Sequence, residues 1–262
     1  MGAPTAGGRP RTTRPKDLQR PPESVGSPTA GRLVGGAELQ AGPHLRLARP
    51  GETHWGLPPL VRLLERAARR VAARFEGATL LVGDLSRPKG GNLGGHRSHT
   101  SGRDADVGFY FVDAEGRSAT LGRYHHVRPD GSVEGAPELR FDDARNWTLV
   151  EAWVTDPRAR VQHIFVSAPL RARLLSHARR VGAYLPVRQR AALAMKQPRH
   201  ALPHDNHFHV RIACPSGGEG RCVGEPTPRR AARRDDVRGA PAPRRGGSRR
   251  APPRAHEVTP GR

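Results

Sequence analysis

The sequence is poor in apolar runs, aromatic residues and cysteines, and each shortage excludes a class of protein. No apolar run in the 262 residues approaches the roughly 20 that a transmembrane helix needs, so we expect no membrane span. Aromatic residues make up only 5% of the chain, whereas proteins that bind single-stranded nucleic acid stack bases on aromatic side chains. We therefore expect no specific nucleic-acid partner, although the net charge is +21.

Cysteine is limited to Cys214 and Cys222, which excludes a four-cysteine zinc site. The segment between them is short and rich in glycine, so the loop can close readily. We predict a disulfide, which suits an oxidising compartment. The alternatives are two free thiols in a surface loop or half of a metal site.

The excess of basic residues is concentrated towards the ends of the chain. Residues 225–262 contain eleven arginines, four acids and seven prolines, and residues 1–21 have a similar character. Such segments cannot bury a core, so we predict disordered basic segments on either side of a domain at residues 22–224. The arginine-rich tail could bind an anionic polymer, or it could reflect only the arginine bias of a GC-rich coding sequence. The first twenty residues lack the apolar stretch of a secretory signal, which indicates a lost leader or a cytosolic protein.

Hydrophobic periodicity within residues 22–224 predicts an α+β domain. Helices are expected at residues 60–75, from Asp142 or Asp143 to about Val154, and from Ser167 to about Tyr184. Strands are expected at residues 79–82, 106–111, 161–166 and 207–212.

Histidine is the residue that the sequence supplies in clusters. Of thirteen histidines, five fall within residues 95–106 and 204–209. Imidazole and carboxylate groups are typical ligands of a catalytic zinc ion, which takes three protein ligands and one water. Because alternate residues of a strand share a face, His207 and His209 point the same way. One of them could bind a metal while the other stands beside the water.

The first cluster leaves its choice of ligands open. A turn at Gly102 would bring an imidazole and a carboxylate of the following strand towards one metal. Periodicity cannot choose between Asp104 and Asp106, which share a strand face, or between His96 and His99.

Two further patterns concern the type of nucleophile and the loop that leads to the site. The sequence contains no Gly-x-Ser-x-Gly, the motif of an exposed serine nucleophile, so we expect no serine mechanism. Residues 90–95 are rich in glycine but lack the ending of a phosphate-binding loop, so we interpret them as a flexible approach to the site. Asp84 is interpreted as a turn or cap residue.

Several motifs that follow one another between residues 22 and 214 resemble penicillin-insensitive murein endopeptidases. They are Glu23-Ser24-Val25-Gly26-Ser27-Pro28, Gly31-Arg32-Leu33-Val34, Trp55-Gly56, Val82-Gly83-Asp84-Leu85-Ser86, Gly90-Gly91, residues 95–106, Arg145-Asn146-Trp147 and residues 204–211. His-x6-Asp followed by a late His-x-His marks the wider group of metallopeptidases that includes lysostaphin-type and D-Ala-D-Ala-type enzymes.

The resemblance implies a function and a role for each clustered residue. It implies zinc ligands at His99, Asp106 and His209, with His207 as an unligated catalytic histidine. His204 would support catalysis, and His96 would support the metal or help to bind a second ion.

The resemblance also implies a fold, a substrate and a location. The fold would be a small antiparallel sheet flanked by helices, with the zinc site on the sheet. The substrate would be the D-alanyl–meso-diaminopimelyl cross-link of peptidoglycan, and the location the periplasm. The alternatives are a D,D-carboxypeptidase with the same zinc site and a non-enzymatic basic protein that binds polyanions or nucleic acid.

Overall fold

The computed structural model describes residues 21–198, 202–216 and 220–224. The chain divides into two units, Met1–Glu225 and Pro226–Arg262, and every described residue belongs to the first. The segments predicted to be disordered lie outside the described residues, apart from Pro21. Within the described ranges, no helix combines the length and the apolar character needed to cross a bilayer.

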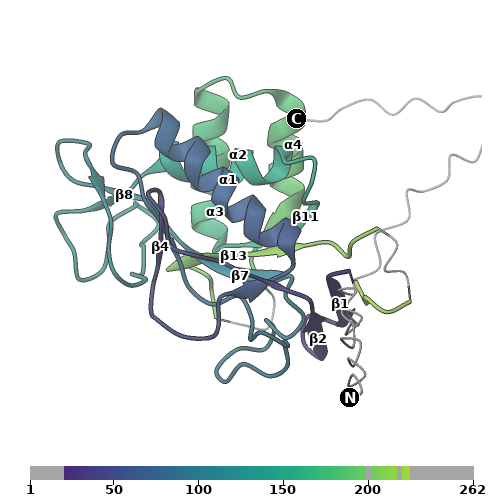
Figure 1. The fold of residues 1–262 in the computed structure, drawn as a ribbon. Coiled ribbons are helices and arrows are strands. Elements are labelled where there is room, and N and C mark those ends of the chain that lie inside the picture. Colours follow the sequence, from purple (N-terminus) through teal and green to yellow (C-terminus); the bar gives the residue numbers. More distant parts are fainter. Residues whose placement is uncertain (1–20, 199–201, 217–219, 225–262) are drawn as a thin grey trace, which may run out of the picture. The chain divides into compact units, whose positions relative to one another are not determined.

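A six-stranded mixed sheet forms the centre of the described domain (Figure 1). Its strands, in spatial order, are β12 (Met195–Lys196), β11 (Val161–Phe165), β13 (His207–Ile212), β7 (Asp104–Gly108), β6 (Leu80–Val82) and β4 (Leu45–Leu47). The three inner pairings are antiparallel, whereas β12 pairs with β11, and β4 with β6, in parallel. The prediction of an α+β class is confirmed. The predicted antiparallel sheet core is present in the inner strands, but the two edge strands pair in parallel. Each parallel pair is joined through helices, which carry the chain back to the same end of the sheet.

Helices cover one face of this sheet (Figure 1). They are α1 (Pro58–Arg74), α2 (Asp143–Thr155), α3 (Ala168–Arg180) and α4 (Leu185–Ala194). The first two match their predicted ranges, and the Asp142 side chain caps α2 by accepting a hydrogen bond from the Ala144 amide at 2.9 Å. The third begins after Ser167 as predicted, but the Ser167 hydroxyl makes no capping hydrogen bond. It also ends earlier than predicted, close to Gly182, whose φ of 65° suits the end of a helix.

Helix α4 was not predicted from the sequence. Only Ala191 and Ala194 of this helix are buried, so its sequence has no stripe of large apolar residues for periodicity to detect.

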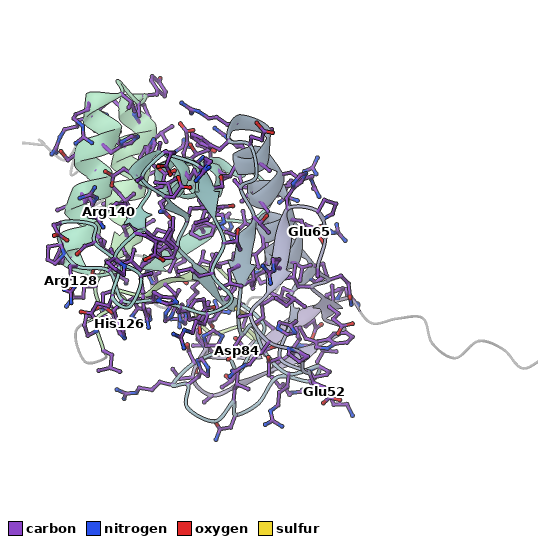
Figure 2. The ribbon with its side chains drawn as sticks, turned by 90° about the vertical axis from the view of Figure 1, so that its left-hand side faces the viewer. Glu52, Glu65, Asp84, His126, Arg128 and Arg140 are labelled. Carbon is purple, nitrogen blue, oxygen red and sulfur yellow. A yellow bond between two sulfur atoms is a disulfide. The ribbon has the colours of Figure 1, made fainter. Side chains whose placement is uncertain are left out.

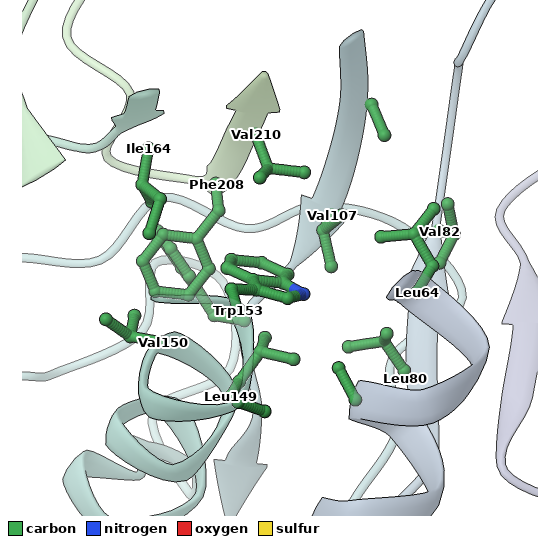
Figure 3. Packing of buried hydrophobic residues seen from close by; sticks show 14 of the residues in the cluster. Leu64, Leu80, Val82, Val107, Leu149, Val150, Trp153, Ile164, Phe208 and Val210 are labelled. Carbon is green, nitrogen blue, oxygen red and sulfur yellow. The ribbon is translucent and has the colours of Figure 1, made fainter. Parts of the chain in front are cut away.

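The hydrophobic core lies between the sheet and the helices (Figure 3). Trp153 of α2 is fully buried and contacts Phe208 of β13 edge to face, with ring centroids 5.6 Å apart. Val210 points to the same side as Phe208 (Figure 3). Because side chains alternate along a strand, His207 and His209 must project from the opposite face of the sheet, away from the helices.

The strand predicted at residues 106–111 is interrupted. It forms β7 and then β8 (Phe111–Val112), with a break around Tyr110. The Asn146 side chain accepts from the Tyr110 amide at 3.0 Å and donates to the Tyr110 carbonyl at 2.8 Å. A side-chain amide from α2 therefore takes the place of a strand partner there.

Short strands complete the described fold. They are β1 (Glu23–Gly26) with β2 (Gly31–Val34), β3 (Ala37–Glu38) with β5 (Trp55–Gly56), and β8 with both β9 (Ser118–Ala119) and β10 (Arg140–Phe141).

The predicted disulfide between Cys214 and Cys222 is confirmed. It ties the chain after β13 to residues 220–224, which pair with the end of β1. The Gly26 amide donates to the Arg221 carbonyl at 2.7 Å, and the Val223 amide donates to the Gly26 carbonyl at 3.0 Å.

Candidate metal and catalytic site

The two histidine clusters meet on the face of the sheet that carries no helix. His209 of β13 lies directly opposite Asp106 of β7 in the antiparallel register. This pairing places the first cluster beside the second, although about a hundred residues separate them in sequence. All six residues singled out by the sequence are brought together here: His96, His99, Asp106, His204, His207 and His209.

The carboxylate of Asp106 is the centre of the cluster. Its Oδ1 lies 3.2 Å from His209 Nδ1, 3.3 Å from His99 Nε2 and 3.4 Å from His207 Nε2. Its Oδ2 lies 3.5 Å from His96 Nδ1. Burial alone would raise the pKa of this carboxyl, but the surrounding imidazoles, His99 first among them, hold the pKa well below its usual value. Asp106 is therefore an ionised acceptor surrounded by four ring nitrogens.

His99 is held in a strained conformation that aims one nitrogen at Asp106. Its φ is 71°, a left-handed value that residues other than glycine rarely adopt. Its Nδ1 lies 2.7 Å from the Leu85 carbonyl, which can only accept, so Nδ1 is the donor and Nε2 is the nitrogen that faces Asp106. The next residue, Thr100, donates to the Pro28 carbonyl at 2.9 Å and accepts from the Gly31 amide at 2.8 Å. These contacts hold the strained segment in place.

Asp104 and Asp106 approach opposite nitrogens of the His209 ring. Asp104 Oδ1 lies 2.7 Å from His209 Nε2, while Asp106 faces Nδ1. Arg211 Nε donates to the same Asp104 oxygen at 2.6 Å. Although burial opposes the charged ring, the two neighbouring carboxylates, Asp104 first, raise the pKa of His209 to about 9. A carboxylate behind a histidine is the usual arrangement around a metal-binding imidazole, since it fixes the tautomer and the ring orientation.

His96 connects Asp106 to Asp84, which lies on the side of the domain away from the helices (Figure 2). His96 Nε2 lies 3.0 Å from Asp84 Oδ2, and this contact is the main cause of the raised pKa of His96. Asp84 also accepts from Thr53 Oγ1 at 2.6 Å and pairs with Arg49. The sequence suggested a turn or cap role for Asp84. Its position immediately beyond the buried strand β6 was the available signal for a place in the site.

His207 and His204 stand beside the Asp106 cluster. His207 Nδ1 lies 2.6 Å from Asn206 Oδ1, which leaves Nε2 facing Asp106. The His204 ring lies 5.1 Å from the His207 ring and 5.7 Å from the His209 ring. Burial lowers the pKa of His204 to about 4, so this imidazole is neutral at pH 7.

The donor set fits a bound transition metal. His96, His99 and Asp106 each offer one ligand atom, and these atoms lie within 4.8 Å of one another. His99 Nε2 and Asp106 Oδ1 are buried and have no hydrogen-bond partner among the described residues. Unpartnered polar atoms are costly in a protein interior, and a shared cation would satisfy both. A mixture of imidazole and carboxylate suits zinc, whereas calcium and magnesium prefer sites made only of oxygen.

Comparison with known proteins finds one family and several relatives that share its name. A family model described as penicillin-insensitive murein endopeptidase matches residues 24–236. The chain is 31% identical over 204 residues to a protein of that name from Haemophilus influenzae, covering 73% of this chain and 64% of the relative. For the Escherichia coli protein of the same name, the identity is 29% over 212 residues, covering 79% and 71%. For that of Klebsiella pneumoniae it is 26% over 203 residues, covering 74% and 68%.

Proposed function

The chain belongs to the penicillin-insensitive murein endopeptidase family, and from this premise we propose that it is a zinc-dependent peptidase acting on peptidoglycan cross-links. The scissile bond would join D-alanine to meso-diaminopimelate. The observation that carries the proposal is the pair of buried, unpartnered atoms on His99 and Asp106, surrounded by further imidazoles.

His99 would bind the metal through Nε2, His209 through Nδ1 and Asp106 through its carboxylate. Asp104 supports this assignment because its carboxylate is hydrogen-bonded to Nε2 of His209, which leaves Nδ1 for the metal. His96 would contribute a further nitrogen or take part in binding a second ion. When bound, zinc supplies a Lewis acid that polarises a carbonyl and lowers the pKa of water towards about 7.

His207 would act as the proton acceptor. The hydrogen bond from Nδ1 to Asn206 leaves the Nε2 lone pair on the side of Asp106, where a water molecule could give up its proton. His204 would support this step as a neutral neighbour, because a second cation close by would make His207 a weaker base. No serine nucleophile is needed, which accounts for insensitivity to β-lactams, since these compounds acylate serine.

We place the protein in the periplasm, in contact with the peptidoglycan that it would cut. The arginine-rich tail could hold it on anionic wall polymer. That contact stays a prediction, because residues 225–262 lie outside the described part of the chain.

Two alternatives give different products. A D,D-carboxypeptidase with the same metal site would release free D-alanine and would not convert cross-linked dimers. A non-enzymatic polyanion-binding protein would keep its affinity for polyanions after the metal ligands had been removed.

The deciding experiment is digestion of purified cross-linked muropeptide dimers, with and without a chelator and with zinc added back, followed by mass spectrometry. We expect zinc-dependent conversion of dimers to monomers. Zinc binding at one ion per chain with no conversion would contradict the endopeptidase assignment and favour a different peptide bond.

Substitutions should separate metal binding from proton transfer. We expect His99→Ala, Asp106→Ala and His209→Ala to lose zinc and activity together. His207→Ala should keep zinc and lose turnover by roughly 100-fold or more, in line with the usual contribution of an acid–base residue. Full activity of His207→Ala would refute its role.

A further inference from the structure

Tyr124 lies beside the site although no motif pointed to it. It belongs to the segment between β9 and β10, and its ring stacks on the ring of His207. The centroids are 4.8 Å apart and the planes are inclined by only 19°. Among the ring contacts of His207, this is the one with nearly parallel planes, since His204 approaches at 54°.

The contacts of His207 with Asn206 and Tyr124 restrict different motions of its ring. The hydrogen bond to Asn206 sets which nitrogen faces Asp106. It leaves the ring free to tilt about the direction of that bond. The Tyr124 ring covers one face of the imidazole and opposes this tilt.

The segment that carries Tyr124 is attached to the chain just before β13. The Val127 amide donates to the Asp205 carbonyl at 2.9 Å, and His126 Nδ1 lies 2.7 Å from Asp205 Oδ1. Asp205 precedes His207 by two residues, so the stacking ring and the imidazole are held by one short framework.

Gly83 makes room for the phenol. A Cβ atom added to Gly83 would lie 2.1 Å from the Tyr124 hydroxyl oxygen and 3.0 Å from the carbon that bears it. Any larger residue there would push the ring off His207. The hydroxyl oxygen is buried and has no hydrogen-bond partner among the described residues.

We propose that Tyr124 is a positioning residue that holds the imidazole of His207 in its productive orientation by stacking on it, with Gly83 providing the space. The proposal rests on the proposed function, because it acts through His207. It assigns the aromatic ring, and not the hydroxyl, as the part of Tyr124 that turnover needs.

The first test compares two substitutions in the full chain. Tyr124→Leu, which removes the ring, should lower kcat on muropeptide dimers by roughly 10- to 100-fold, the loss typical of a misplaced catalytic group. KM, bound zinc and the unfolding temperature should change little. Tyr124→Phe, which keeps the ring, should recover most of kcat. Tyr184→Leu serves as the matched control, because Tyr184 is 72% exposed.

A double-mutant cycle tests the part played by Gly83. Gly83→Ala alone should lower kcat about as much as Tyr124→Leu, since both remove the stacking ring from His207. In the Tyr124→Leu background it should lower kcat less than about threefold, because no phenol remains to be displaced. Equal losses from Gly83→Ala in both backgrounds would overturn the proposal. So would a loss in Tyr124→Phe as large as that in Tyr124→Leu.

A measurement without substrate separates failure of this proposal from failure of the proposed function. In proton NMR of the full chain, the Tyr124 ring current should shift the His207 Hε1 signal upfield, and Tyr124→Leu should abolish that shift. Absence of the shift in the wild-type protein contradicts the stacking itself. A clear shift in a protein that cleaves no dimers contradicts the peptidase assignment and leaves the stacking established.

Discussion

At the residue scale, the site depends on two neighbouring carboxylates that do different work. Asp106 faces the ring nitrogens of His99, His207 and His209, whereas Asp104 lies behind His209 and pairs with Arg211. Asp104 is completely buried, and burial alone would raise its pKa. Its contact with His209, followed by the charge of Arg211, lowers the pKa instead. The ionised Asp104 carboxylate therefore fixes which nitrogen of His209 faces Asp106.

Neutralising Asp104 should weaken metal binding without removing a ligand. We expect Asp104→Asn to raise the dissociation constant for zinc by about 10- to 100-fold, as is usual for the partner of a metal-binding histidine. Competition with a chromophoric chelator would measure it. Asp113→Asn, a change in an exposed turn, is the control. Unchanged affinity in Asp104→Asn would show that His209 does not depend on this carboxylate.

The sequence predicted which residue types meet at the site but could not separate residues that occupy equivalent positions. Asp104 and Asp106 share a strand face, so periodicity treats them alike, and only the contacts of each with His209 distinguish them. Asp84 and Tyr124 were not predicted as parts of the site. Their contacts with His96 and His207 join residues that no local pattern relates.

At the element scale, α1 and α2 are joined by a partly buried ion pair at the end of α2. Asp156 accepts from Arg66 Nε at 2.7 Å and from the amides of Arg158 and Ala159, both at 2.8 Å. Burial of Asp156 opposes its charge, but these hydrogen bonds, with Arg66 first, lower its pKa. The folded protein therefore binds a proton here less readily than the unfolded chain does.

This ion pair should contribute to the pH dependence of stability. The contribution is fully present above the unfolded pKa of about 3.9 and is lost as the pH falls through the lower folded value. We expect Asp156→Asn to lower the unfolding temperature at pH 6 and to differ progressively less from the wild type below about pH 4. Thermal unfolding from pH 6 to pH 2.5 measures this, with Glu52→Gln as an exposed control. A difference that stayed constant across this range would contradict the linkage.

The elements themselves were predictable to the extent that their apolar residues were periodic. The helix at Pro58–Arg74 buries seven residues at helical spacing and was found, whereas α4 buries only two alanines and was missed. The parallel edges of the sheet depend on helical connections, which strand periodicity does not describe.

At the scale of the whole molecule, the disulfide links the chain just after β13 to residues 220–224, which pair with the end of β1. Arg103, which is fully buried next to Asp104, donates to the Val223 carbonyl at 2.8 Å within the linked segment. The disulfide therefore helps to fix the Val223 carbonyl, which accepts a hydrogen bond from the buried Arg103 guanidinium.

Removing the disulfide should lower the free energy of unfolding and leave zinc binding unchanged. We expect Cys222→Ser to reduce the free energy of unfolding by about 2 kcal/mol, the value for a short closed loop, while bound zinc stays at the wild-type level. Urea denaturation without reductant measures the first, and metal analysis the second. Cys214→Ser should give the same result as Cys222→Ser. An unchanged urea midpoint in both variants would contradict a stabilising role.

The alternation of side chains along β13 limits which mutations the gene can tolerate. Phe208, Val210 and Ile212 are buried on the helix side, and His207, His209 and Arg211 contribute to the opposite face. A one-residue shift of the strand would exchange the two sets. An in-frame codon insertion or deletion within β13 would thus abolish the chemistry and the fold in one event, whereas point substitutions can alter either alone. We therefore expect descendants of this gene to vary in β13 by replacement and to keep its length fixed.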